Sequence, residues 1–232
     1  AAMSDKAHHA SDEGVRKQNQ AAYEYLVPIV KGWSTEMSLN VTSTGVQVHG
    51  GMGFIEETGA AQYYRDAQIL TIYEGTTAIQ ANDLVGRKTA RDAGAVAKQF
   101  IAQARATQAE LAASGNADLQ AIAKQLALGA DAMEEVVNFV VANFKSDIKA
   151  VFSGSVPYLK LAGVVLGAWQ LGRAALIAHQ QNVAGKGDTS FNQAKIATAR
   201  FFADHILTTA FGLRSSIVEG SAGVMALSIE QF

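Results

Sequence analysis

A single carboxylate, Glu74, lies beside a glycine in the short apolar segment 72–76, between two helical patterns. Its apolar neighbours Ile69, Ile72 and Tyr73 would partly remove it from water, and a desolvated carboxylate is a stronger proton acceptor. A lone glutamate beside a glycine can equally be a solvated loop residue. We interpret the apolar surroundings as favouring a general base.

The residues that follow Glu74 suit the binding of a polar ligand group. Gly75 lets the backbone approach a ligand closely, and Thr76 and Thr77 can cap the next helix. Helix N-termini attract negative or electron-rich groups. The segment therefore combines a proton acceptor with a place for a polar group.

Three blocks of sequence occur in a fixed order between residues 47 and 80: QVHGGMGF, then YRDA, then IYEGT. Together they resemble the C-terminal helical domain of the acyl-CoA dehydrogenases. The long helical tail, which begins near residues 83–88, resembles the larger branch of that family. That branch includes enzymes acting on 3-methylmercaptopropionyl-CoA and carries an extra helical domain after the dehydrogenase core. The resemblance covers the whole chain and is strongest up to Lys88.

The resemblance implies α,β-dehydrogenation of an acyl-CoA thioester, with FAD accepting the hydride. By the family's motif Glu74 is the catalytic base, and its backbone N–H donates to the thioester oxygen. The motif also implies contacts with FAD and with substrate. The FAD contacts fall on Gln47, Gly50, Gly51 and Thr76, and the substrate contacts fall on Tyr73 and Gly75. Gly50 and Gly51 can alternatively serve only to shape a turn.

The resemblance further implies an electron-transferring flavoprotein as electron acceptor and a homo-oligomer, either a dimer or a tetramer. Three other functions remain open: an acyl-CoA oxidase, a DNA-associated flavoprotein of the same superfamily, and a non-catalytic helical oligomerisation module. The DNA-associated branch would require a basic helical face, whereas the tail's basic residues are dispersed among acids. Flavin binding would separate the enzyme from the non-catalytic module.

The composition favours a helical protein with a sizeable core. Of 232 residues 49% are hydrophobic, and only two are proline. The net charge of −2 does not favour nucleic acid, and the absence of cysteine excludes disulfides and thiolate metal sites. The longest uncharged window, between Lys160 and Arg173, is shorter than the roughly 20 residues that cross a bilayer. We therefore expect a cytoplasmic protein with no membrane span.

We expect no metal site. His179 and His205 have no second ligand at a suitable helical spacing, and no Glu-x-x-His pattern accompanies the acidic residues of the tail. The acidic cluster Asp131, Glu134 and Glu135 is expected to be a solvated face.

The spacing of apolar residues predicts an all-α fold with a boundary near residues 92–95. Residues 1–92 would end the dehydrogenase helical domain, and residues 93–232 would form an appended four-helix-type bundle. In the first part we expect a helix over 11–45, kinked or interrupted at Pro28, then a loop and two further helices. The loop is placed at 50–59 and the helices at 60–69 and 76–90.

Four helices are expected in the second part, over 96–113, 118–144, 157–185 and 189–218, with Asp118 capping the second. Their apolar stripes would form the bundle core. The large side chains expected there are Phe139, Phe144, Leu159, Trp169, Leu176, Phe201, Phe202 and Phe211.

No strand-rich segment precedes these helices, although the family's enzymes have an N-terminal helical domain and a middle β domain. We interpret the chain as a C-terminal fragment that is inactive by itself. Tyr25, Trp33 and Ile72 would then face surfaces that the other domains cover.

Overall fold

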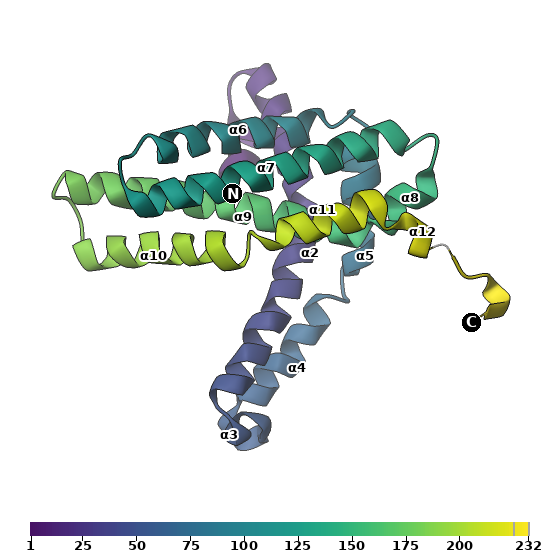
Figure 1. Ribbon diagram of the computed structural model, residues 1–232, viewed down its shortest axis with the longest axis horizontal. Coiled ribbons are helices and arrows are strands. Elements are labelled where there is room, and N and C mark those ends of the chain that lie inside the picture. The colour runs from purple at the N-terminus through teal and green to yellow at the C-terminus, as the bar shows by residue number, and fades with distance from the viewer. Residues whose placement is uncertain (225, 232) are drawn as a thin grey trace.

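The structure is a computed structural model that describes residues 1–224 and 226–231, and within these residues every element is helical. The first part of the chain forms one long helix followed by several short ones (Figure 1). These are α1 (Ala2–His9), α2 (Glu13–Val48), α3 (Gly51–Phe54), η1 (Glu56–Thr58), α4 (Ala60–Leu70), α5 (Thr77–Asp83) and η2 (Leu84–Ala90).

The second part is a bundle in which α6, α7, α9 and the pair α10–α11 pack side by side (Figure 1). Its elements are α6 (Ala95–Ala112), α7 (Ala117–Asn143), α8 (Ile148–Ser153), α9 (Ser155–Val183), α10 (Thr189–His205), α11 (Thr209–Glu219), α12 (Ser221–Val224) and η3 (Ile229–Gln231). The predicted all-α class and four-helix-type bundle are confirmed. The cap of α7 is Asn116 and not Asp118, because the Asn116 side chain accepts from two backbone N–H groups.

The last long helix of the bundle is broken, contrary to the continuous helix expected over 189–218. Between α10 and α11 the chain turns at residues 206–208, and this places Leu207 in the core with no exposed surface. A Cβ on Gly129 would lie 2.8 Å from the Leu207 Cδ1 atom, so the leucine packs directly on the backbone of α7. Leu207 therefore packs in the core at the point where the helix breaks.

The predicted bundle core is right for most of its members. Leu159 and Trp169 are buried, and Phe139, Phe144, Leu176 and Phe202 are partly buried against the core. Two predictions are wrong, because Phe201 is 61% exposed and Phe211 is 39% exposed. Phe201 lies against the His205 ring instead, with the ring centroids 4.7 Å apart.

Helix α2 runs through Pro28 without interruption, so of the two outcomes expected there, a kink or an interruption, the interruption is wrong. A proline inside a helix removes one backbone hydrogen bond and usually destabilises the helix. Here Pro28 is buried together with Ala22, Tyr25, Ile29 and Gly32 on one face of α2. Burial of this face against the bundle stabilises the helix by more than the loss of the backbone hydrogen bond at Pro28 destabilises it.

The two parts of the chain share one core. Tyr25 of α2 is 1% exposed, stacks on Phe100 of α6, and its hydroxyl hydrogen bonds the Tyr158 hydroxyl of α9 at 3.1 Å. The Tyr158 hydroxyl also bonds the Thr89 hydroxyl at 3.0 Å. The expectation that Tyr25 faces a missing domain is therefore wrong, because α9 and α6 cover it.

Beyond Gly32 no residue of α2 is buried, and its second half leaves the bundle. Residues 34–70, comprising this half of α2, α3, η1 and α4, form a protruding helical arm with α3 at its tip (Figure 1). The loop expected at 50–59 instead contains the short helices α3 and η1. The arm is what separates the candidate site residues in space.

Helices α5 and η2 bring the chain back from the arm to the bundle. The single helix expected over 76–90 changes at Leu84 into η2, a π-helix with Leu84, Val85 and Thr89 buried. A left-handed turn with Ala93 at φ 55° and Gly94 at φ 76° follows η2. The side chain of Asp92 accepts from the backbone N–H groups of Gly94 and Val96 there, which starts α6.

Helix α9 is long and apolar enough to cross a membrane by length and composition alone, with a mean hydropathy of 1.5 over 18 residues. Of that window 61% is buried inside the protein. Contacts with α7, α10, α6 and α2 surround it, so its hydropathy is accounted for by its place at the centre of the core.

Candidate active site

Glu74 lies on a sharp turn between α4 and α5, at the base of the arm. Its backbone is left-handed, with φ 53°, which is uncommon for a residue other than glycine. Gly75 follows with φ 93°, and a Cβ there would lie 2.8 Å from the Gln80 Nε2 atom. The backbone conformation therefore favours glycine at position 75, whereas the flexible Gln80 side chain could move to make room for a Cβ.

The Glu74 side chain is exposed, and so are its apolar neighbours: Ile69 is 53% exposed, Ile72 52% and Tyr73 48%. The expected desolvation of Glu74 by these neighbours is therefore absent in this chain. Among residues 1–224 and 226–231 the carboxylate has no hydrogen-bond or ion-pair partner, and neither does the backbone N–H of Glu74. One acceptor and one donor of the same residue are thus free to meet a ligand.

Two charged side chains of α2, Lys31 and Glu36, form hydrogen bonds with the Glu74 turn and the start of α5. The Lys31 ammonium donates to the carbonyl oxygens of Leu70 and Gly75, each at 2.8 Å, and lies 5.6 Å from the centre of the Tyr73 ring. Glu36 accepts a short hydrogen bond from the Thr77 hydroxyl. These contacts connect both ends of the turn to one helix.

Thr76 caps α5, as expected, because its hydroxyl accepts from the Ile79 N–H at 3.4 Å. Thr77 does not cap this helix; its hydroxyl donates to Glu36 and its N–H donates to the Thr71 carbonyl at 3.3 Å. The N-terminus of α5 therefore lies directly beside Glu74, with its first turn anchored to α2.

Gln47, Gly50 and Gly51 lie together at the tip of the arm, where all three are exposed. Gly50 has φ 62°, so the turn itself explains that glycine. Gly51 has no such conformation, and a Cβ there would meet no atom within 4 Å. Nothing in the described part of the chain requires glycine at position 51, whereas a Cβ on Gly53 would lie 2.3 Å from the Val46 carbonyl oxygen.

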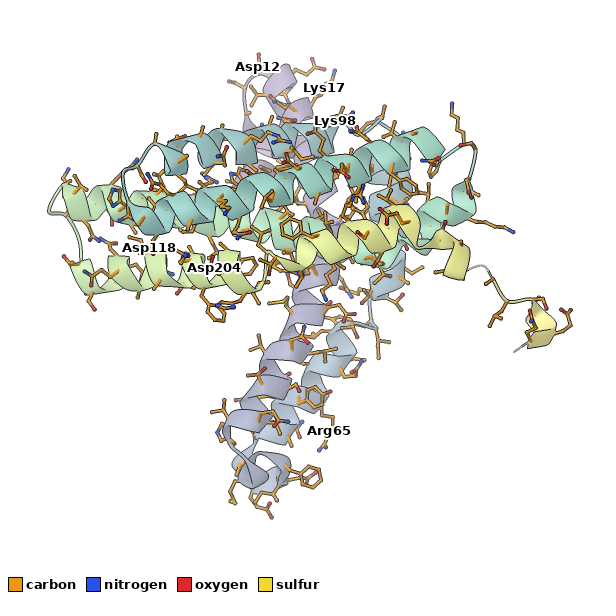
Figure 2. All side chains as sticks on the ribbon, viewed as in Figure 1. Asp12, Lys17, Arg65, Lys98, Asp118 and Asp204 are labelled. Atoms are coloured by element: carbon orange, nitrogen blue, oxygen red, sulfur yellow. The ribbon has the colours of Figure 1, made fainter. Side chains whose placement is uncertain are left out.

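An open groove of about 880 Å³ runs along the arm between α2 and α4 and includes Gln47 in its wall. Arg65 lies on its α4 side, where it pairs with Glu56 at 3.1 Å (Figure 2). The groove does not include Glu74. Helix α4 has 11 residues and so spans about 16 Å, which separates the arm tip from the Glu74 turn.

The structure therefore brings the predicted site residues together in two groups. Tyr73, Glu74, Gly75 and Thr76 form the turn at the base of the arm, and Gln47, Gly50 and Gly51 form its tip. Lys31 and Glu36 were missed by the sequence analysis. The signal for them was weak: two charged residues five positions apart on the otherwise amphipathic helix α2.

The acidic side chains of α7 form ion pairs with arginines of neighbouring helices. Arg105 of α6 bonds both Asp131 and Glu134 at 2.7 Å, and Arg214 of α11 bonds Glu135. These carboxylates are partly exposed and link neighbouring helices of the bundle. No group of three or more potential metal-binding side chains occurs in the part of the chain that the structure describes.

Two protein-family models match successive parts of the chain. Residues 1–90 match the family model described as "Acyl-CoA dehydrogenase, C-terminal domain". Residues 93–228 match the model described as "Acetyl-CoA dehydrogenase C-terminal like".

Individual relatives align along nearly the whole chain. A 3-methylmercaptopropionyl-CoA dehydrogenase of Ruegeria pomeroyi is 47% identical over 97% of the chain and 38% of its own length. The broad-specificity linear acyl-CoA dehydrogenase FadE5 of Mycobacterium tuberculosis is 32% identical over 90% of the chain and 35% of its own length. A butyryl-CoA dehydrogenase of Syntrophomonas wolfei is 29% identical over 98% of the chain and 37% of its own length. The chain thus spans little more than a third of the length of these relatives.

Proposed function

The chain belongs to the acyl-CoA dehydrogenase family, and we propose that it forms the C-terminal part of an enzyme that oxidises an acyl-CoA thioester between its α and β carbons. The observation that carries this proposal is the Glu74 turn. Its left-handed backbone leaves both the carboxylate and the backbone N–H of Glu74 exposed and without partners in the described residues.

The chemistry requires a proton acceptor because the α-hydrogen of a thioester is only weakly acidic. The Glu74 carboxylate takes the α-proton, so that a C–H bond breaks and a carboxyl O–H bond forms. The free N–H of Glu74 donates to the thioester oxygen and stabilises the negative charge that develops there. FAD, when bound, would supply the two-electron oxidation by accepting the β-hydrogen with its electron pair, and the product would carry a carbon–carbon double bond.

The arm tip fits one edge of a cofactor site. Gly51 is unexplained by conformation or by packing, and the open space around it allows a bound group to approach the backbone. The exposed Gln47 amide makes no hydrogen bond within residues 1–224 and 226–231, so it is available to a ligand. We assign Gln47, Gly50 and Gly51 to FAD, together with Thr76 beside Glu74.

A cofactor that contacts both the arm tip and the Glu74 turn has two possible positions. It either extends along the arm of one chain, or it contacts the arm tip of one copy and the Glu74 turn of another. The arm exposes large apolar side chains that a partner surface would cover, including Val48 at 80%, Phe54 at 81% and Tyr63 at 73%. We therefore propose a homo-oligomer, a dimer or a tetramer, in which the arms of the subunits are buried.

The names of the relatives indicate the substrate class and the electron acceptor. All three relatives described above are acyl-CoA dehydrogenases, so we propose an acyl-CoA as substrate. The subunit CarC of the caffeyl-CoA reductase-Etf complex of Acetobacterium woodii is 38% identical over 22% of the chain. This supports an electron-transferring flavoprotein as acceptor. We also propose that the enzyme acts in the cytoplasm.

The base assignment is tested by Glu74→Gln in the full-length protein, which keeps the side-chain shape and removes the proton acceptor. Loss of a positioned base lowers kcat by ~10²–10⁴-fold, while bound flavin and helical content stay unchanged. The matched control is Glu110→Gln, an exposed carboxylate on α6, which leaves kcat unaltered. A Glu74→Gln enzyme with wild-type kcat would exclude Glu74 as the base.

A further inference from the structure

Lys31 contacts the Glu74 turn from a helix that lies far away in the sequence. Its ammonium donates to the Gly75 carbonyl, 44 residues later in the chain, and to the Leu70 carbonyl, 39 residues later. The side chain is half-buried between α2 and the turn. One cation therefore connects the two ends of the segment that carries Glu74.

Both acceptors have a physical reason to be bound. Leu70 is the last residue of α4, and the final carbonyls of a helix lack partners within the helix and carry partial negative charge. The Gly75 carbonyl lies at the other side of the turn, just before the cap of α5. An ammonium has three donors and can satisfy both carbonyls at once.

The turn needs this connection because burial does not hold it. Ile72, Tyr73 and Glu74 are all exposed, and the positive φ of Glu74 is unfavourable for a residue with a side chain. Within the turn the remaining backbone bonds are few: Ile72 and Tyr73 donate to the Ile69 carbonyl, and Thr77 donates to the Thr71 carbonyl. Contacts to α2 therefore set the position of residue 74.

We propose that Lys31 is a positioning residue for the catalytic base: by clamping the Leu70 and Gly75 carbonyls it fixes the Glu74 carboxylate and N–H against the acyl group. This rests on the proposed role of Glu74. Lys31 does not take part in the chemistry, and the neighbouring hydrogen bond between Glu36 and Thr77 fixes the start of α5 in the same way.

The consequence is a loss of rate with little loss of binding. A displacement of about 1 Å in a reacting group can lower the rate about 10²-fold. The Lys31 ammonium bonds two backbone carbonyls of the turn, so its removal deletes none of the proposed contacts with the substrate. Removing Lys31 should therefore lower kcat and leave KM nearly constant.

The test compares three variants of the full-length enzyme. Lys31→Met keeps the length of the side chain and removes the donors, and Lys31→Arg keeps a cation with several donors. Lys17→Met is the matched control, because Lys17 lies on the same helix at the end opposite the arm (Figure 2). Among residues 1–224 and 226–231 its one ion-pair partner is Glu13. kcat and KM are measured per bound flavin, with an α-deuterated acyl-CoA to report on proton transfer.

We expect Lys31→Met to lower kcat about 10²-fold, with KM within about threefold of wild type and an isotope effect at least as large. Lys31→Arg recovers part of the rate, and Lys17→Met behaves as wild type. The proposal is overturned if Lys31→Met keeps the wild-type kcat, or if Lys31→Arg is as slow as Lys31→Met while a lowered melting temperature accounts for both.

Amide hydrogen exchange separates this proposal from that of the base. In Lys31→Met the N–H groups of Ile72, Tyr73 and Thr77 exchange faster than in wild type, and in Glu74→Gln they exchange at the wild-type rate. If Glu74→Gln remains active while Lys31→Met loosens these amides, the base assignment fails and the clamp stands. If the amides are unchanged in Lys31→Met, the clamp fails whatever Glu74 does.

Discussion

Trp33 of α2 packs closely on Gly163 of α9, where the base of the arm meets the bundle. A Cβ added to Gly163 would lie 2.3, 2.4 and 2.8 Å from the Cγ, Cδ2 and Cβ atoms of Trp33, whereas ordinary contact begins at 3.4 Å. The Gly163→Ala variant must therefore move Trp33, and α2 with it, by about 1 Å. Overpacking of this kind costs about 1–3 kcal/mol.

For a protein of 232 residues that cost corresponds to a fall in Tm of roughly 2–12 °C. The assay is thermal unfolding of this chain followed by circular dichroism. The control is Gly212→Ala on α11, where a Cβ meets no atom within 4 Å and the substitution should stabilise the helix by up to about 1 kcal/mol. Adding Trp33→Leu to Gly163→Ala should restore part of the loss. If Gly163→Ala melts at or above the temperature of Gly212→Ala, α2 does not pack on α9 as described.

Three further predictions concern the core, the arm and the whole chain. Burial raises the pKa of both Tyr25 and Tyr158 above 10. The free energy of unfolding should therefore be constant with respect to these groups below about pH 10 and fall as pH rises from there toward the folded-state pKa. The slope is at most ~1.4 kcal/mol per pH unit for each tyrosine. Urea unfolding at increasing pH should show this decline, and Tyr25→Phe should reduce its slope; an unchanged slope would contradict the prediction. In the arm, Gly51→Ala should leave the melting temperature unchanged or slightly higher but weaken FAD binding by the full-length enzyme. Gly53→Ala should destabilise by ~1–3 kcal/mol because of the Val46 carbonyl. Unchanged FAD affinity in Gly51→Ala would contradict the assignment of Gly51 to FAD. The chain purified alone should be helical, free of tightly bound flavin and inactive, and stoichiometric FAD bleached by an acyl-CoA would contradict this.

Local patterns were sufficient to predict most helices. The helices expected over 60–69, 96–113, 118–144 and 157–185 match α4, α6, α7 and α9 to within a few residues. Apolar periodicity could not show the break before α11, because the buried residues Ala199, Ala203, Leu207 and Ala210 keep the three- and four-residue steps of one helix across it. Nor could it show a π-helix at η2, whose side-chain pattern differs little from that of an α-helix.

The residues that hold the site depend on contacts between distant segments. The motif around Glu74 predicts the base, but Lys31 and the turn are more than 40 residues apart and meet only because α2 passes beneath α4 and α5. The exposure of Glu74 was also unpredictable, because its apolar neighbours face outward in this chain. The expected interruption at Pro28 is absent for a related reason: burial of one face of α2 stabilises the helix by more than the loss of one backbone hydrogen bond costs.

The most direct test of Glu74 follows the α-proton itself. The full-length enzyme is incubated in deuterated water with an acyl-CoA analogue that has α-hydrogens but no transferable β-hydrogen, and deuterium at the α-carbon is measured by mass spectrometry. The wild-type enzyme should exchange the α-hydrogen, and Glu74→Gln should slow this exchange by ~10²-fold or more, with Glu110→Gln exchanging as wild type. Exchange at the wild-type rate in Glu74→Gln would contradict the assignment of Glu74 as the base.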